Sequence, residues 1–201
     1  MIARRLTERR YTQFFAKAAI DNDMHPCYSE NNYKKEVIPM PDMLVKLYEL
    51  PPVEPHLEKL RAQNIEIRRP IGPENYAVIN WIRENFDDGW AGEAENSFFQ
   101  SPKSMFIAIR KESGKKPEIL GFACYDATVK GFFGPTGVGK AERGQGIGLA
   151  LLLATLHGMK DAGYGYGVIG GAGPVDFYKK CCGAIVIEDS TPGVYRWMVT
   201  G

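Results

Sequence analysis

The pattern of apolar and polar positions divides the chain into short alternating segments and one long apolar segment. Apolar and polar residues alternate over 65–69, and β-rich runs follow at 104–110 and 119–128, which predicts three strands. The charged turn between the last two runs predicts a hairpin. By contrast, residues 149–154 read Leu-Ala-Leu-Leu-Leu-Ala, and Gly163 follows at a suitable distance, which predicts a buried helix of about four turns with a C-terminal glycine cap.

Weaker patterns predict the remaining elements of a mixed α/β (α+β) fold. The expected helices span 54–63, 74–86, 91–99 and 174–181, and the expected further strands span 43–50, 131–138, 167–169, 184–188 and 194–199. Strand 131–138 contains glycines and a proline, which weaken an ordinary strand, so we expect a bulge or a splay of the sheet there.

The chain is long enough for one domain, with or without an appendage. Residues 1–42 contain one predicted helix at 7–20 and then a polar, proline-rich stretch, so we expect a helical or irregular N-terminal extension. Residues 43–201 are expected to form the domain itself.

Composition excludes several classes of protein. Hydrophobic residues make up 44% and charged residues 24% of the chain, as in globular proteins with a substantial core. The net charge of +1 does not suggest nucleic-acid binding or docking to an acidic membrane. No apolar run approaches the ~20 residues needed to span a bilayer, and no secretory signal is expected at the start.

Cysteine and histidine positions do not suggest a metal site. The cysteines lack the paired spacing of a metal or disulfide framework, and the histidines do not cluster; these residues are Cys27, Cys124, Cys181 and Cys182, and His25, His56 and His157. We therefore expect no metal and a reducing, cytoplasmic compartment.

The strongest chemical signal is a glycine-rich turn between the strand that ends at Val138 and the long helix. Gly144, Gly146 and Gly148 alternate along this turn, and Arg143 stands directly before them. The first N–H groups of a helix lack internal partners, and the helix dipole adds partial positive charge there. Without Cβ atoms in the way, a large anion can approach these groups, so the turn predicts a phosphate or pyrophosphate site.

The segment Arg143-Gly144-Gln145-Gly146-Ile147-Gly148, preceded by Val138, resembles the acyl-CoA signature of the GNAT N-acetyltransferase superfamily. The resemblance extends over about residues 65–199. It implies a mixed central sheet that splays between its fourth and fifth core strands, with helices on both faces. It also implies acetyl-CoA as co-substrate, with its pyrophosphate held by this turn.

A second glycine-rich stretch, 165–173, has two interpretations. It contains Gly-x-Gly-x-x-Gly with Glu188 further on, as in dinucleotide-binding folds, but too few residues follow Gly173 to complete such a fold. We therefore expect these glycines, Gly173 included, to let the backbone pass close to the acyl-CoA chain.

Residues 177–184 resemble the family's second CoA motif, in which a tyrosine on a helix precedes a glycine. The resemblance makes Tyr178 the candidate general acid, because a phenol with a pKa of ~10 can protonate the departing thiolate and remain neutral at pH 7. The alternative is a tyrosine that only packs on its helix. Two departures are Gly171 where the family has asparagine, and one extra residue between Tyr178 and Gly183.

The general base is less clear. Many family members place a glutamate on the strand before the pyrophosphate turn, but residues 131–138 contain no carboxylate. Asp126 is the nearest acid and is our candidate base; its alternative is an exposed carboxylate in a turn. Further candidates are Glu93, Glu95 and Glu188, and a water chain could also remove the proton. Backbone N–H groups near Gly137 or Val138 could bind the thioester carbonyl oxygen.

These features predict an acetyl-CoA-dependent N-acetyltransferase in which the primary amine of a small molecule attacks the thioester directly. The alternative is a GNAT domain that binds acyl-CoA without catalysis, as a sensor or partner-binding module. Homodimer formation is left open.

Overall fold

A mixed sheet of seven strands forms the centre of the structure, a computed structural model that describes residues 40–199. The strand order is β2-β3-β4-β5-β6-β1-β7, and the β5–β6 pair is parallel while the others are antiparallel. The strands are β1 Met43–Lys46, β2 Ile65–Arg68, β3 Met105–Arg110, β4 Glu118–Tyr125, β5 Phe132–Val138, β6 Tyr166–Ile169 and β7 Ile185–Val186.

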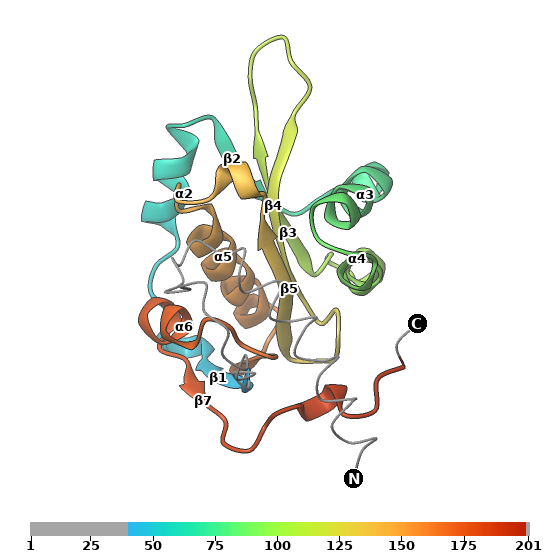
Figure 1. Cartoon of the computed structure of the whole chain (residues 1–201). Helices are drawn as coiled ribbons and strands as arrows, with labels where there is room; N and C mark the ends of the chain where they lie inside the picture. The colour runs from blue at the N-terminus through green and yellow to red at the C-terminus, as the bar shows by residue number, and fades with distance from the viewer. Residues whose placement is uncertain (1–39, 200–201) are drawn as a thin grey trace, which may run out of the picture.

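Helices cover both faces of this sheet (Figure 1). Helices α3 and α4 lie on one side, and the long α5 lies on the other side with α2 and α6. The α-helices are α2 Glu54–Arg61, α3 Asn75–Asn85, α4 Asp88–Glu95, α5 Ile147–Asp161 and α6 Val175–Cys182; short 3-10 turns are η1 Leu47–Glu49, η2 Gly72–Glu74, η3 Asn96–Phe99, η4 Lys140–Glu142 and η5 Gly193–Tyr195.

Strand β4 shows how the sequence pattern produces two cores. Successive side chains of a strand point to opposite faces of the sheet. Ala123 and Tyr125 accordingly join the core under α5, whereas Phe122 and Cys124 join the core under α3 and α4. Because both faces are covered, β4 is buried from Leu120 to Tyr125, and it provides a fixed support for its neighbour β5.

The sheet splays between β5 and β6, as the resemblance implied. The two strands pair only at Phe132 with Val168 and at Phe133 with Ile169, and β5 then continues to Val138 without β6 beside it. The register between β4 and β5 also shifts in the stretch of β5 that contains Gly134 and Pro135. The predicted bulge and splay are therefore both confirmed.

Strand β1 lies inside the sheet, antiparallel to β6 on one side and β7 on the other. The predicted strand 43–50 was too long, because β1 ends at Lys46 and the 3-10 turn η1 follows. Lys46 pairs with Tyr166, the first residue of β6, so no strand partner remains beyond it. The turn instead places Leu47 in the core, where it is fully buried.

Further predictions were wrong in detail: the strand predicted at 119–128 ends at Tyr125, and the one predicted at 184–188 covers only Ile185–Val186. The helix predicted at 91–99 begins at Asp88, because the Asp87 side chain caps it by accepting a hydrogen bond from Trp90 N. Its predicted last turn, 96–99, is a 3-10 turn. Residues 194–199 do not form a strand. The residues just before this segment are hydrogen-bonded to the residues just before β1: Asp42 N donates to Ser190 Oγ, and Thr191 Oγ1 donates to Met40 O. After β7 the chain leaves the edge of the sheet (Figure 1).

Residues 40–42, the end of the predicted extension, contact the domain. Ala172 N donates to Pro41 O, and Gly171 N donates to the Asp42 carboxylate at 2.8 Å. The rest of the predicted extension, including the helix at 7–20, lies outside the described residues.

Candidate active site

The glycine-rich turn connects β5 to α5 in the way that the sequence indicated. Gly144 and Gly146 have φ values of +77° and +87°, which side-chain-bearing residues rarely adopt, so the chain can reverse here only with glycine or a strained residue. Gly146 is the N-cap of α5, and a Cβ at this position would meet no atom within 4 Å. Open space therefore lies in front of the first backbone N–H groups of α5.

A first cavity of about 280 Å³ begins at this turn. It contains six of the eight residues predicted to bind acetyl-CoA: Val138, Arg143, Gly144, Gly146, Ile147 and Gly148. Its other wall is formed by β5 and α6; the remaining lining residues are Phe133, Thr136, Gly137, Glu142, Leu149, Leu152, Pro174, Phe177 and Tyr178. This cavity has peptide N–H groups and a cation at one end and apolar walls beyond them. Such a cavity fits a phosphorylated molecule with a long uncharged arm, and acetyl-CoA is a molecule of this kind.

An acid in the first cavity is neutralised by the protein. Glu142 accepts hydrogen bonds from Arg110 and, at 3.0 Å, from Gln145 Nε2. The hydrogen bond from Arg110 is the main reason that the pKa of Glu142 lies below its usual value, so Glu142 is ionised at neutral pH. Gln145, which was predicted to contact acetyl-CoA, is not among the residues lining this cavity, and its side chain donates to Glu142. Arg143 donates from Nε to the Val138 carbonyl at 3.3 Å, which holds it beside the turn.

Tyr178 lines the first cavity. It is 5% exposed, and its ring makes edge-to-face contacts with Phe133 and Phe177. Burial raises the pKa of Tyr178 above its ordinary value, with a smaller contribution from the neighbouring cysteines. The phenol is therefore protonated throughout the physiological range, as a proton donor must be.

A second, smaller cavity of about 60 Å³ meets the first at three residues, Phe133, Thr136 and Tyr178. Its other lining residues come from many parts of the chain: Met40, Trp90, Glu93, Thr128, Gly134, Pro135, Ile169, Gly170, Gly171, Gly173 and Tyr195. Gly173, predicted to bind acetyl-CoA, thus lines the second cavity rather than the first. Phe133 and Thr136, on either side of the bulge in β5, line both spaces, and the bulge residues Gly134 and Pro135 line the second.

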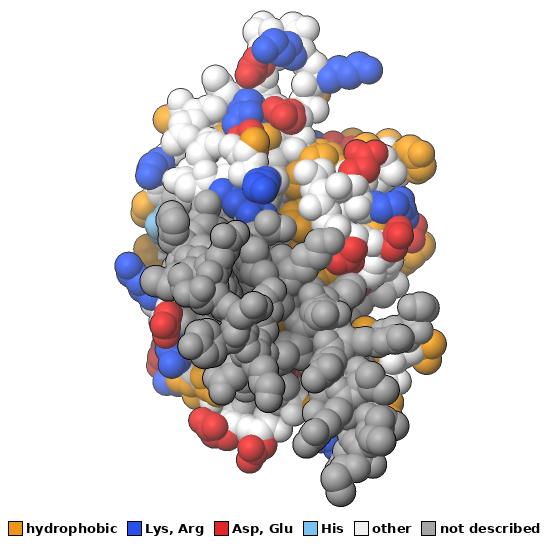
Figure 2. All heavy atoms as spheres, in the orientation of Figure 1, with side chains coloured by type: hydrophobic (Ala, Val, Ile, Leu, Met, Phe, Trp, Pro, Cys, Tyr) orange, Lys and Arg blue, Asp and Glu red, His pale blue; other side chains and the backbone are white. Residues whose placement is uncertain are grey.

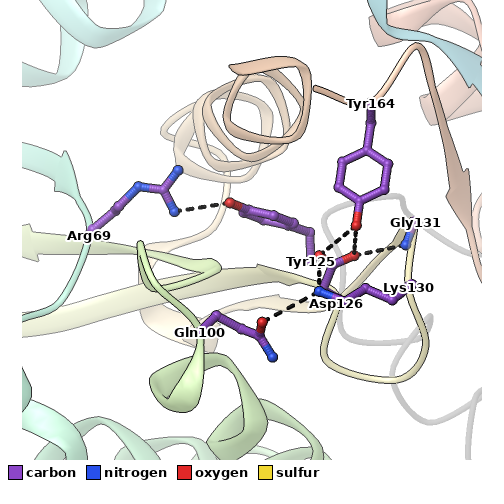
Figure 3. A network of polar contacts seen from close by, with 7 residues as sticks. All are labelled: Arg69, Gln100, Tyr125, Asp126, Lys130, Gly131 and Tyr164. Carbon is purple, nitrogen blue, oxygen red and sulfur yellow. Dashed lines mark hydrogen bonds and ion pairs between the residues drawn. The ribbon is translucent and has the colours of Figure 1, made fainter. Parts of the chain in front are cut away.

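Asp126 is at the centre of a local polar network (Figure 3). Its carboxylate accepts hydrogen bonds from Tyr164 at 2.9 Å and from Gly131 N at 2.7 Å, and Lys130 lies 3.1 Å away. Asp126 lies in a turn with φ of +55°, as its alternative interpretation predicted, but its side chain is only 5% exposed. It is not among the residues lining either cavity. These contacts hold the β4–β5 connection together.

The other acids considered as bases are placed differently. Glu93 lines the second cavity and accepts a hydrogen bond from Thr128 Oγ1. Glu95 and Glu188 are exposed and line neither cavity. Of the four acids, only Glu93 is brought to the space beside Tyr178.

Sequence reasoning missed most of the second cavity. Trp90 was given no role, and Tyr195 was assigned to a strand that does not form; both line this cavity. No local motif marks them, because each reaches the cavity through tertiary packing. Thr136 could have been suspected from its position, since it follows the bulge-forming Gly134 and Pro135.

Metal sites and membrane spans are two further features to consider in the described part of the chain. Within residues 40–199, no group of three or more His, Cys, Asp or Glu side chains is arranged to hold a metal ion. In the same part of the chain, no helix combines the length and hydrophobicity needed to cross a membrane. On the face shown in Figure 2, acidic and basic side chains are interspersed over the described surface.

Comparison with known proteins agrees with this geometry. Residues 75–184 match the sequence model of the "Acetyltransferase (GNAT) family". Among solved structures, the chain is similar to a GCN5-related N-acetyltransferase from Sphaerobacter thermophilus, with a TM-score of 0.51 and 24% identity over 74% of this chain and 49% of that chain. No protein of curated function matches the chain.

A second solved structure is described as a "GCN5-related glucosamine N-acetyltransferase region" in a fungal multi-domain GH3 beta-N-acetylglucosaminidase. Its TM-score is 0.59, with 13% identity over 73% of this chain and 19% of that chain. The chain thus spans a fifth to a half of the length of these two proteins. At these identities, both comparisons concern the fold.

Proposed function

Because the chain belongs to the GNAT acetyltransferase family, we propose that it transfers an acetyl group from acetyl-CoA to the primary amine of a small molecule. The observation that carries this proposal is the meeting of two cavities beside one buried phenol. The first has the features of a CoA site, and Phe133, Thr136 and Tyr178 border both the first and the second.

Acetyl-CoA would be held by the start of α5. The N–H groups of the turn from Gly144 to Gly148 would bind the pyrophosphate, with Arg143 beside them, and the apolar cavity walls would surround the uncharged arm. When bound, acetyl-CoA supplies an activated acyl group whose leaving group is a thiolate.

The chain's own residues supply the rest of the chemistry. The acceptor amine attacks the thioester carbonyl carbon, the new C–N bond forms, and the C–S bond breaks. The hydroxyl of Tyr178 gives its proton to the departing sulfur, which requires a phenol that is neutral before the reaction. Backbone N–H groups of β5 at Gly137 or Val138, which border the first cavity, would stabilise charge on the carbonyl oxygen.

The size of the second cavity supports a small acceptor. About 60 Å³ admits an amine on a narrow arm, and a larger body would have to remain outside. The fungal neighbour is named for glucosamine, a small primary amine, so glucosamine belongs in the test panel.

The test is an acceptor screen. The full chain is mixed with acetyl-CoA and a panel of primary amines, including glucosamine, and free thiol and acetylated product are measured together. The expected result is equal amounts of thiol and a product heavier by one acetyl group. Tight binding of acetyl-CoA without transfer to any amine would instead favour the non-catalytic acyl-CoA-binding module.

A further inference from the structure

The second cavity contains one carboxylate, that of Glu93 on α4. Glu93 is half-buried, and its Oε1 accepts a hydrogen bond from the hydroxyl of Thr128, on the connection between β4 and β5. Helix α4 is fixed beneath it, because Trp90, Ala91 and Ala94 are buried in the core under α3 and α4. The carboxylate is therefore held at the cavity wall by helix α4 and by the hydrogen bond from Thr128 on the β4–β5 connection.

The surroundings of Glu93 disfavour its negative charge. Desolvation raises the pKa of Glu93, the negative charge of Asp87 at the N-cap of α4 raises it further, and the Thr128 hydrogen bond partly offsets both. Burial raises the pKa of the Cys124 thiol on β4, and the nearby negative charge of Glu93 raises it further. Within residues 40–199, no lysine or arginine forms an ion pair with Glu93.

The remaining walls suit a small organic cation. The aromatic residues Trp90, Phe133, Tyr178 and Tyr195 line the same cavity. Aromatic rings attract cations by their electrostatic quadrupole, and a half-buried carboxylate gains most from a positively charged partner that is itself desolvated. Ammonium groups on unbranched chains meet these requirements within about 60 Å³.

We propose that the second cavity binds the acceptor as a primary ammonium ion on an unbranched arm, and that Glu93 is the base that takes its first proton. This proposal rests on the proposed acetyltransferase function and assigns its acceptor site. Glu93 replaces the strand carboxylate that residues 131–138 lack, and it takes over the role that the sequence suggested for Asp126.

The proton steps balance. R–NH₃⁺ gives one proton to the Glu93 carboxylate and becomes R–NH₂, whose lone pair attacks the thioester carbon. Tyr178 protonates the departing sulfur, and the second N–H proton, released as the amide forms, restores the phenol. Glu93 then releases its proton to solvent. A carboxylate with a raised pKa suits the first step, because the difference between its pKa and that of the alkylammonium ion becomes smaller.

The experiment measures thiol release from acetyl-CoA with n-butylamine as acceptor, for the full chain and its variants. For Glu93→Gln we expect kcat/KM for n-butylamine to fall by about 100-fold or more, within the range typical of general base catalysis. The dissociation constant of acetyl-CoA should change by less than about threefold, because Glu93 does not line the first cavity. The matched control is Glu95→Gln, an exposed glutamate on the same helix, with an expected change of less than about twofold.

The pH profile separates a base from a packing residue. In the wild-type protein, kcat/KM should decrease as the pH is lowered, and the midpoint of this acid limb should lie above the ordinary glutamate pKa of 4.5. The Glu93→Gln variant should lack this acid limb. Thr128→Val removes the hydrogen bond that lowers the pKa of Glu93, so the limb should move to higher pH. A purely structural role for Thr128 would reduce the rate without moving the limb.

Stability gives an independent readout. The folded state binds a proton at Glu93 more readily than the unfolded state, so Glu93 lowers stability as pH rises through its pKa. Glu93→Gln should therefore gain stability relative to the wild type as the pH rises above the ordinary glutamate pKa of 4.5, while it loses activity. A variant that loses both would contradict the proposal.

Three outcomes distinguish this proposal from the proposed function. If the wild-type protein does not bind acetyl-CoA in calorimetry, the proposed function itself fails. If it binds acetyl-CoA and acetylates n-butylamine, but Glu93→Gln is as active as the wild type, only the role of Glu93 is overturned. If tert-butylamine is acetylated as fast as n-butylamine, the preference for an unbranched arm is overturned.

Discussion

Most lining residues of the first cavity come from one continuous segment, 136–152, whereas those of the second come from positions as far apart as Met40 and Tyr195. The first presents backbone groups at the start of a helix, with glycines that keep side chains away. The second presents side chains, a carboxylate among aromatic rings. Both are bordered by Phe133 and Thr136, which lie on either side of the bulge in β5.

This difference explains what each cavity can recognise. Backbone N–H groups and a helix dipole bind any phosphate of suitable shape, so the first cavity suits a co-substrate common to a whole family. Side chains on separate elements can be exchanged one at a time without changing the fold, so the second cavity can specify an acceptor. The two regions should accordingly respond to different kinds of substitution.

The largest effect is expected at Tyr178, where the two cavities meet. Tyr178→Phe removes the hydroxyl and keeps the ring contacts with Phe133 and Phe177, so kcat should fall by about 100-fold, within the range for general acid catalysis. The affinity for acetyl-CoA should be nearly unchanged. Because the pKa of Tyr178 lies above its ordinary value of 10.0, the ratio of wild-type to variant kcat should stay constant from about pH 6 to about pH 9. Steady-state kinetics over this range measures both.

A kcat of Tyr178→Phe within about threefold of the wild type would show that the tyrosine only packs on α6, the alternative for this residue.

Gly146 tests the backbone character of the first cavity. Gly146→Val forces a branched side chain into φ of +87°, at a cost of about 1–3 kcal/mol, and turns the first N–H groups of α5 away from the cavity. The affinity for acetyl-CoA should fall by about 10- to 100-fold in calorimetry.

Gly163 provides the matched control for this substitution. Its φ is +95°, it follows the other end of α5, and a Cβ there also meets no atom within 4 Å. Gly163→Val should cost similar stability and leave the affinity for acetyl-CoA unchanged. Equal loss of affinity in both variants would mean that the effect comes from general destabilisation of α5 and not from the turn.

The same contrast explains how much could be predicted from the sequence. Gly144, Gly146 and Gly148 act through local backbone geometry, and the bulge follows from Gly134 and Pro135, so these features could be located without a structure. The order of the elements through most of the domain follows from hydrophobic periodicity for the same reason.

The second cavity could not be predicted, because no local pattern indicates which side chains converge there. Glu93 and Thr128 are hydrogen-bonded although 35 positions separate them. Distance along the chain favoured Asp126 over Glu93, but the positive φ of Asp126 and its contact with Tyr164 direct it into a different network. The apolar run 194–199 is typical of a strand, but it has no strand partner.

Asp126→Asn compares the two candidate bases directly. This substitution weakens the acceptor of the Tyr164 and Gly131 hydrogen bonds in a side chain that is 5% exposed, so stability should fall by about 1–3 kcal/mol in denaturant unfolding. Turnover of n-butylamine should change by less than about threefold, in contrast to Glu93→Gln. A 100-fold loss of kcat together with loss of the acid limb would restore Asp126 as the base.

The smallest effect is expected at Arg110, which neutralises an acid inside the first cavity. Arg110→Met leaves the carboxylate of Glu142 without its main partner and close to the expected position of the pyrophosphate. The resulting repulsion should weaken acetyl-CoA binding by about three- to tenfold at low salt, and less at high salt because ions screen it. Calorimetry at two salt concentrations measures this difference.

The double variant Arg110→Met, Glu142→Gln identifies the cause. If Arg110 acts by neutralising Glu142, removing the negative charge as well should restore most of the lost affinity, and the two substitutions will be strongly non-additive. If affinity stays low in the double variant, Arg110 supports the turn in some other way. The backbone of the first cavity would then depend on a distant side chain, and the contrast between the two cavities would be weaker than their lining residues indicate.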